Sequence, residues 1–248
     1  GARQAAGNDV ADIRRLCEHA ARYGARVFVT VNTIIYEDEL AQAKEMIRQT
    51  VEAGVDALIV QDLAGIRLVD ELVAEGMRKV ILHASTQSAL LNPERAEFLA
   101  SLGYARLILE RELSLTQIRE IASAAPQCEI EFFVHGALCV CYSGQCYMSE
   151  AISGRSANRG ACIQACRSRY DLVDGTGKVL VRDKALLSLK DYNLRNRLAD
   201  LAEAGVSSFK IEGRLKNESY VRNVVRDYSI ALDQLVAAHP DKYRRASF

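Results

Sequence analysis

The 248-residue chain has no tryptophan and only three prolines. It also lacks an apolar run near the roughly 20 residues that a membrane-spanning helix needs, and no secretory signal pattern opens it. Its 32 basic and 32 acidic residues cancel, so net charge gives no overall drive toward nucleic acid. These absences are typical of an ordinary globular protein. Because seven cysteines suggest metal or redox chemistry in a reducing compartment, we expect it in the cytoplasm.

Hydrolytic and nucleotide-binding motifs are also missing. The chain has no H-E-x-x-H, no G-x-S-x-G and no papain-type cysteine signature, and no base is placed by sequence near Ser143. No glycine-rich phosphate loop follows any strand-like segment. The sequence therefore disfavours a zinc protease, a serine hydrolase and a doubly wound nucleotide-binding protein.

What is present is a regular alternation of strand-like and helical patterns. Branched and apolar runs predict six strands, at residues 26–33, 56–62, 79–87, 105–112, 129–138 and 206–213. Helical patterns predict helices at residues 37–54, 66–77, 92–103, 114–125, 187–205 and 217–236. Between residues 139 and 187 the alternation is interrupted, and a hairpin is expected to turn at Asp174 and Gly175.

Strict alternation predicts parallel strands with crossover helices, either in a doubly wound sheet or in a TIM-like (β/α)8 barrel. The barrel is favoured because polar side chains collect where the strands end, and a barrel has its active site there. Six strands do not close such a barrel, and the chain begins without methionine. We therefore expect a barrel truncated at its N-terminus, with two β-α units missing. Its barrel domain comprises residues 1–138 and 188–248, and residues 139–187 form a cysteine-rich insertion before the last strand.

The insertion holds most of the chain's thiols in "FFVHGALCVCYSGQCYMSEAISGRSANRGACIQACR". Cys139, Cys146, Cys162 and Cys166 lack the C-x-x-C knuckles of structural zinc sites, whereas iron–sulfur clusters accept more varied spacings. Interspersed glycines would let the backbone wrap a cluster. The competing interpretation is that these thiols are small buried apolar groups. Cys141 faces away or replaces a ligand, and Cys17 and Cys128 resemble core residues.

The strand ends supply the other candidate residues. Period-two alternation places Lys210 and Glu212 on one face of their strand, either as catalytic groups or as a buried ion pair that fixes the architecture. His135 ends the strand before the cysteines and is a third candidate catalytic residue. Candidate substrate-binding residues at the same rim are Asn32, His83, Gln87, Glu110, Arg155 and Arg214. The arginines favour an anionic substrate such as a phosphate, a carboxylate or a nucleic-acid backbone.

The cysteine stretch, "LLSLKDYN", "SFKIEGRLKNESYV", "VTVNT", "DALIVQD", "STQ" and "LERELSL" together resemble peptidase family U32, the collagenase-like peptidases. The resemblance covers essentially the whole chain and is greatest toward the branch that hydroxylates cytidine in ribosomal RNA. It implies a [4Fe-4S] cluster on Cys139, Cys146, Cys162 and Cys166, and a link to prephenate metabolism. Cys141 departs from the small residue commoner in the family.

The resemblance implies an iron–sulfur-dependent RNA hydroxylase acting on a nucleobase, either a 23S rRNA cytidine or a tRNA uridine. RNA is then the expected partner, with a prephenate-derived compound as hydroxyl donor and no membrane. The alternatives are a peptidase, as the family's name says, and a non-catalytic iron–sulfur scaffold subunit. Sequence alone sets neither the RNA nor the oligomeric state.

Overall fold

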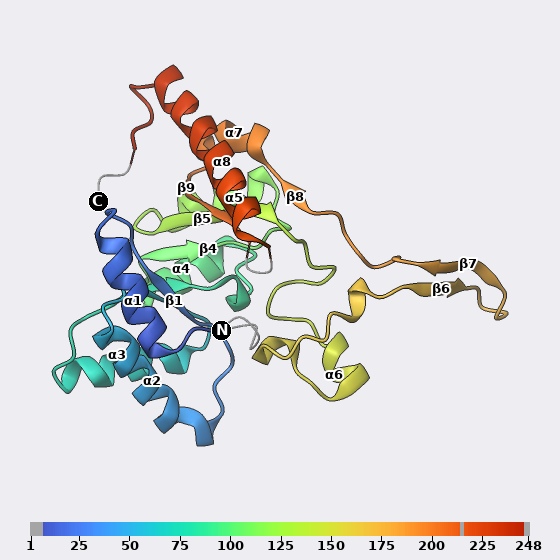
Figure 1. Ribbon diagram of the computed structural model, residues 1–248, viewed down its shortest axis with the longest axis horizontal. Helices are drawn as coiled ribbons and strands as arrows, with labels where there is room; N and C mark the ends of the chain where they lie inside the picture. The colour runs from blue at the N-terminus through green and yellow to red at the C-terminus, as the bar shows by residue number, and fades with distance from the viewer. Residues whose placement is uncertain (1–6, 214–215, 246–248) are drawn as a thin grey trace.

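The computed structural model describes residues 7–213 and 216–245, and its centre is a twisted parallel sheet (Figure 1). Six parallel strands follow the order β1-β2-β3-β4-β5-β9, so neighbours in sequence are neighbours in space. They are β1 (Phe28–Val31), β2 (Ala57–Val60), β3 (Ile81–Ala84), β4 (Arg106–Ile108), β5 (Glu129–Gly136) and β9 (Val206–Ile211). This order is that of a half-barrel, and it confirms an α/β fold with all six predicted strands.

Helices connect the strands, and most begin at a side chain that caps them. They are α1 (Val10–Ala21), α2 (Leu40–Glu52), α3 (Leu63–Ala74), α4 (Pro93–Ser101), α5 (Leu115–Ala124), α7 (Leu198–Glu203) and α8 (Glu218–Ala238). Asn92 accepts a hydrogen bond from the Arg95 backbone before Pro93, as the sequence predicts. No described helix is long and apolar enough to cross a membrane. The sequence analysis did not predict α1.

The predicted helix at residues 187–205 is correct only in its second half. Its first half is extended and forms β8 (Tyr192–Asn193), which pairs antiparallel with the end of β5. The Leu194 backbone N–H donates to the Val134 carbonyl over 2.9 Å. These sheet hydrogen bonds override the local helical pattern, and the helix begins only after a 3-10 turn, η6 (Arg195–Arg197).

The two faces of the sheet have different chemistry. Alternate residues of the strands, such as Leu58, Leu82 and Ile130, are buried against the helices in the main core. A smaller apolar group, made of Ile59, Ile108 and Phe133, lies on the concave face with Phe28 packed against it. Period-two alternation therefore gives the sheet one face that packs on the helices and one concave face whose side chains can line a binding site.

Residues 137–191 leave the sheet after β5 and return at β8. They contain α6 (Met148–Ser153), the 3-10 turns η4 (Ala157–Arg159) and η5 (Ala165–Arg167), and an antiparallel hairpin of β6 (Tyr170–Val173) and β7 (Val179–Lys184). The Asp174 carboxylate accepts from the backbones of Thr176 and Lys178, so the chain turns where the sequence predicts. Figure 1 shows this hairpin extending away from the sheet and its helices.

Tyr228 of α8 joins the helix to the sheet through its hydroxyl group. The hydroxyl donates to the Val134 carbonyl over 2.8 Å and contacts the Asn193 side chain at 3.0 Å. We expect Tyr228→Phe to lower the free energy of unfolding by about 0.5–1.5 kcal/mol, measured with urea, because each acceptor loses one hydrogen bond and keeps another from a backbone N–H.

Tyr104→Phe is the matched control, since the Tyr104 hydroxyl is buried and has no hydrogen-bond partner among the described residues. It should leave stability unchanged or raise it slightly. Equal losses in both variants would contradict the assigned role of the Tyr228 hydroxyl.

Candidate functional site

A cavity of about 630 Å³ lies on the concave face of the half-barrel and opens toward the carboxyl ends of the strands. Its apolar base is formed by Phe28, Ile59, Ile108 and Phe133. Residues 137–149 and 157–167 contribute most of the opposite wall, which we call the roof. The cavity is therefore bounded by the sheet on one side and by the cysteine-rich segment on the other.

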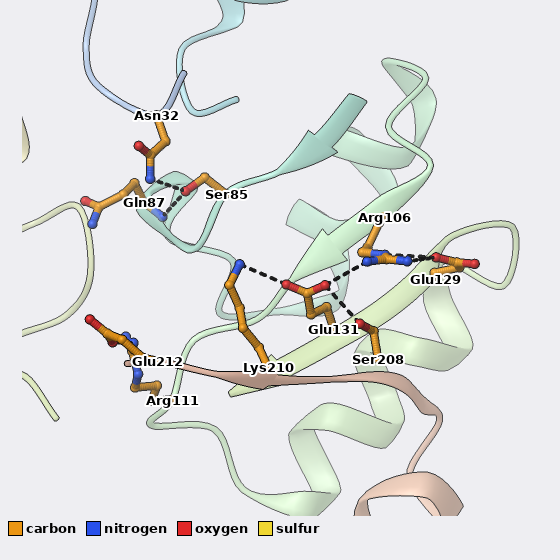
Figure 2. A network of polar contacts seen from close by, with 10 residues as sticks. All are labelled: Asn32, Ser85, Gln87, Arg106, Arg111, Glu129, Glu131, Ser208, Lys210 and Glu212. Carbon is orange, nitrogen blue, oxygen red and sulfur yellow. Dashed lines mark hydrogen bonds and ion pairs between the residues drawn. The ribbon is translucent and has the colours of Figure 1, made fainter. Parts of the chain in front are cut away.

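A buried carboxylate organises the charged layer of the cavity. Glu131 of β5 is 5% exposed and pairs with Lys210 of β9 at 2.9 Å and with Arg106 of β4 at 2.8 Å (Figure 2). The Ser208 hydroxyl donates to it over 2.9 Å. Burial alone would raise the pKa of Glu131, but its cationic neighbours and these hydrogen bonds lower it below the ordinary value. Glu131 is therefore held as a carboxylate.

A second ion pair lies nearer the cavity mouth. Arg111 pairs with Glu212 and stacks its guanidinium 3.6 Å from the centre of the Phe133 ring. Glu212 also lies against Gly136, where an added Cβ would approach the Glu212 Cβ to 2.7 Å. The predicted pair Lys210 and Glu212 thus lines one cavity, as alternation implies, but each is ion-paired with a different partner.

Amides form the polar part of the rim. Asn32 and Gln87 both line the cavity, and the Asn32 side chain donates to the Ser85 hydroxyl over 3.2 Å. The same hydroxyl accepts from the Gln87 backbone, as Figure 2 shows. These amides lie beside the aromatic floor of the cavity. They can therefore hydrogen-bond the edge of a planar ring that stacks on that floor.

His135 does not lie at the cavity mouth, which corrects its predicted place. A β-bulge between Phe133 and His135 turns its side chain to the helix-packed face, where it meets the Tyr220 hydroxyl at 2.7 Å and the Tyr228 ring. Burial lowers the pKa of His135. An acid/base role inside the cavity therefore has no support from its position.

Three further candidate residues lie off the cavity lining, and one cannot be placed. His83 is buried with its ring edge on Phe28, and burial lowers its pKa to about 4. Glu110 is fully buried beneath the roof, and Arg155 is exposed outside the cavity. Arg214 falls outside the described residues. Among the predicted substrate-binding residues, only Asn32 and Gln87 line the cavity.

Sequence reasoning missed Arg106, Arg111 and Glu131. The signal was present in "EIEFFVH", where a charged residue sits inside an otherwise apolar strand. A charge at a buried strand position requires a partner, and that partner comes here from other strands.

All five cysteines of the roof line the cavity: Cys139, Cys141, Cys146, Cys162 and Cys166. Desolvation raises the pKa of Cys139, and the nearby Cys166 and Cys162 add to this effect. Cys141 has a pKa raised in the same way, with Cys146 as its thiol neighbour. Within the roof, Cys139 therefore lies near Cys162 and Cys166, whereas Cys141 lies near Cys146.

Two arginines hold the roof over the cavity. Arg159 donates to both Glu39 carboxylate oxygens, at 2.8 and 2.5 Å, and lies 3.8 Å from the centre of the Tyr36 ring. Its hydrogen bonds lower the pKa of Glu39 to about 2. Arg167 donates to the carbonyls of Leu138 and Leu189, which tie the two ends of the segment together.

The thiols fit an iron–sulfur cluster in number and in the wall that they share. The described part of the chain contains no group of three or more His, Cys, Asp or Glu side chains arranged to hold a metal ion. A four-iron cluster separates its thiolates more widely than a single ion does, because each thiolate binds a different iron. Five thiols on one wall are the donor type of an iron–sulfur cluster, and no compact single-metal site is formed among the described residues.

Glu110 gives the site a pH dependence. Burial raises its pKa to about 8, and the nearby Ser143 of the roof only partly offsets the rise. Between pH 5 and 8 the unfolded chain releases this proton while the folded protein keeps it, so stability falls as pH rises. We expect Glu110→Gln to be more stable than wild type by about 1–3 kcal/mol at pH 8 and to lack this slope.

Urea unfolding at a series of pH values measures this difference. Glu120→Gln, on the exposed face of α5, is the control and should follow wild type throughout. If the difference in stability between wild type and Glu110→Gln stays constant across this pH range, Glu110 is not neutral in the folded protein.

The described geometry can be compared with known proteins. Over 247 residues the chain is 49% identical to the 23S rRNA 5-hydroxycytidine synthase of Escherichia coli (strain K12), covering 100% of this chain and 37% of that protein. It is 35% identical to tRNA hydroxylation protein P1 of Bacillus subtilis (strain 168), covering 92% and 54%. A collagenase of Porphyromonas gingivalis (strain ATCC BAA-308 / W83) is 33% identical, with coverage of 90% and 55%.

The chain thus spans between about a third and a half of these relatives' length. A solved structure of a U32 peptidase aligns over 73% of each chain, with 15% identity and a TM-score of 0.46. The profile of peptidase family U32 matches residues 1–247. On this match and these identities, the chain belongs to peptidase family U32.

Proposed function

We propose that this chain carries the active site of an RNA-modifying hydroxylase that acts on a pyrimidine base, with cytidine in 23S rRNA as the first candidate. The observation that carries the proposal is one cavity bounded by an aromatic and charged sheet face and by five thiols. The 49% identical relative is named for rRNA cytidine hydroxylation, and a 35% identical one for tRNA hydroxylation. A tRNA uridine is the second candidate substrate.

The cavity suits a single flipped base. Its volume, about 630 Å³, lies within the range of small-molecule pockets. Enzymes that modify a base extrude it from the stack and hold it by stacking and edge hydrogen bonds. Phe28 and the Arg111 guanidinium, which covers the Phe133 ring, offer stacking surfaces, and the Asn32 and Gln87 amides offer edge contacts. Glu212 and Lys210 would position the base or move a proton, with Lys210 held in place by Glu131.

We propose that Cys139, Cys146, Cys162 and Cys166 hold a [4Fe-4S] cluster at the roof. Such a cluster would supply electron transfer or substrate activation. The chain's own contribution is to present the base from the sheet side and to exclude water by closing the roof through Arg159 and Arg167. Arg106, Arg111 and Lys210 line the cavity together with two carboxylates, Glu131 and Glu212, and the remaining positive charge supports an anionic hydroxyl donor, for which a prephenate-derived carboxylate is the candidate.

The half-barrel is proposed to belong to a (β/α)8 barrel with two further β-α units between β9 and β1. On this proposal residues 1–138 and 188–248 form the barrel domain, and residues 139–187 form its insertion. The support is the parallel order of the six strands and the position of the cavity at their carboxyl ends.

Peptidase activity is the alternative, since a 33% identical relative is named a collagenase. A serine or cysteine peptidase needs a base beside its nucleophile, usually histidine. All four histidines of the chain lie in the described part, and none lines the cavity. The geometry therefore gives a hydrolytic role less support than hydroxylation. A non-catalytic iron–sulfur scaffold is the third alternative, and only activity measurements separate it.

The cluster proposal predicts which thiols hold iron. After anaerobic reconstitution, Cys139→Ser, Cys146→Ser, Cys162→Ser and Cys166→Ser should each lose the visible absorption of the cluster and most of the bound iron, because each removes one thiolate. Cys141→Ser and the buried control Cys128→Ser should retain both. Iron retained by Cys166→Ser but lost by Cys141→Ser would show that Cys141 is the fourth ligand, and iron retained by all five roof variants would reject the cluster.

The function is tested by mass spectrometry of nucleosides from total RNA. A strain that lacks the gene should lose a hydroxylated pyrimidine, and the wild-type gene should restore it. Lys210→Met and Glu212→Gln should lower its formation rate by roughly 100-fold or more, the usual range for proton-transfer groups. Lys242→Met removes a comparable charge from an exposed ion pair with Glu203 and should restore the nucleoside fully.

Unchanged nucleosides in the deletion strain would reject the hydroxylase. Full activity of the Lys210 and Glu212 variants would reject their assigned roles. Loss of activity together with a large fall in melting temperature in both variants would assign these residues to structural ion pairs instead.

A further inference from the structure

Gln87 lines the cavity with a side-chain amide that forms no hydrogen bond within the part of the chain that the structure describes. The carboxylates on the sheet side of the cavity are ion-paired, and the neighbouring Asn32 amide is oriented by its 3.2 Å hydrogen bond to the Ser85 hydroxyl. Gln87 is only partly buried, and Figure 2 shows its side chain extending away from Ser85. The Gln87 amide is therefore available to a ligand in the cavity.

The backbone of Gln87, in contrast, is held from several sides. Its N–H donates to the Ser85 hydroxyl over 3.2 Å at the start of the 3-10 turn η3 (Thr86–Ser88). Gly144 of the roof packs so closely on it that an added Cβ would come within 2.2 Å of the Gln87 carbonyl oxygen. Ala89 ends the turn with a φ of 53°, a left-handed conformation that costs a residue with a Cβ. These contacts fix where the amide lies and leave its orientation free.

A free amide has a particular use toward pyrimidine bases. A carboxamide carries an acceptor on one side and a donor on the other, and the terminal torsion of glutamine that exchanges them is soft. The edge of cytosine at positions 3 and 4 presents an acceptor, N3, and a donor, the 4-amino group. Uracil presents the reverse, with N3–H as donor and O4 as acceptor. A glutamine amide therefore pairs with cytosine in one orientation and with uracil after a half-turn.

We propose that Gln87 binds this edge of the target base and accepts cytosine and uracil alike. The inference rests on the proposed hydroxylation of a pyrimidine, and it makes the cavity specific for pyrimidines as a class. Asn32 does not serve in the same way, because its amide nitrogen is engaged by Ser85. The choice between a cytidine and a uridine target is then made by the RNA around the base, which lies outside the cavity.

The test measures how three nucleotides bind to the full chain by isothermal titration calorimetry or NMR titration. The probes are cytidine 5′-monophosphate, uridine 5′-monophosphate and the 5′-monophosphate of 2-pyrimidinone riboside, which has no group at position 4. Gln87→Met removes the donor and the acceptor of the amide, and Gln87→Glu keeps acceptors only. Gln127→Met and Gln127→Glu are the matched controls, since Gln127 is exposed and precedes β5 at the opposite end of the strands from the cavity.

We expect wild type to bind the cytidine and uridine nucleotides with dissociation constants within about 5-fold of each other, and the 2-pyrimidinone nucleotide roughly 3- to 10-fold more weakly, because one hydrogen bond is lost. Gln87→Met should bind all three with similar affinity. Gln87→Glu should favour cytidine over uridine by roughly 10-fold, because a carboxylate accepts from the 4-amino group but meets the lone pairs of O4 in uracil. Both Gln127 variants should follow wild type.

A wild-type preference between cytidine and uridine above this limit would overturn the inference, as would undetectable binding of all three nucleotides. Gln87→Met could instead weaken all three by one factor and still bind the 2-pyrimidinone nucleotide least well. That result would assign Gln87 to the shape of the cavity and would also overturn the inference. Failure of the hydroxylase is recognised separately: unchanged nucleosides in the deletion strain, with pyrimidine binding intact, would reject the proposed function alone.

Discussion

The site depends on the burial of Glu131 in the sheet. Moving a carboxylate out of water costs several kcal/mol unless cations and donors surround it. Arg106 comes from β4, and Ser208 and Lys210 come from β9, so the carboxylate joins three neighbouring strands. The pairing of β5 with β9 contains register shifts, and these side-chain contacts fix how the two strands lie despite them. The charged layer also keeps this part of the concave face polar.

The roof is held by a different kind of interaction. Few of its residues belong to the main core, and its position follows from Arg159 on Glu39, from Arg167 on two carbonyls, and from Gly144 against the Gln87 backbone. An added Cβ at Gly144 would approach the Gln87 carbonyl oxygen to 2.2 Å, so only glycine fits there. Polar contacts of this kind order a long segment weakly. Metal–thiolate bonds would add the missing stabilisation, since metal binding is coupled to folding.

The strands and most helices could be predicted because local periodicity determines which side chains are buried. His135 was misplaced because a bulge, which depends on pairing with β9, reverses the alternation that sequence reasoning assumes. Arg106 and Glu131 were missed because a buried charge is explained only by partners distant in sequence. The residues at 187–193 were assigned to a helix because the pattern does not show that β5 needs a strand partner at its end. The site was therefore harder to predict than the fold, because it depends more on contacts between residues that are distant in sequence.

The division between sheet and roof has a consequence for how one scaffold can act on different RNAs. The sheet face presents the stacking surfaces, the ion pairs and the amides that would contact a base, and a pyrimidine needs little more than this. The surroundings of that base in folded RNA differ far more than the base itself does, and on the proposed function the segment between β5 and β8 would meet them. A change in this segment would then alter which RNA fits without disturbing Glu131 and its partners. On the proposed function the sheet face would hold the base, whereas the segment that carries the thiols would meet the rest of the RNA.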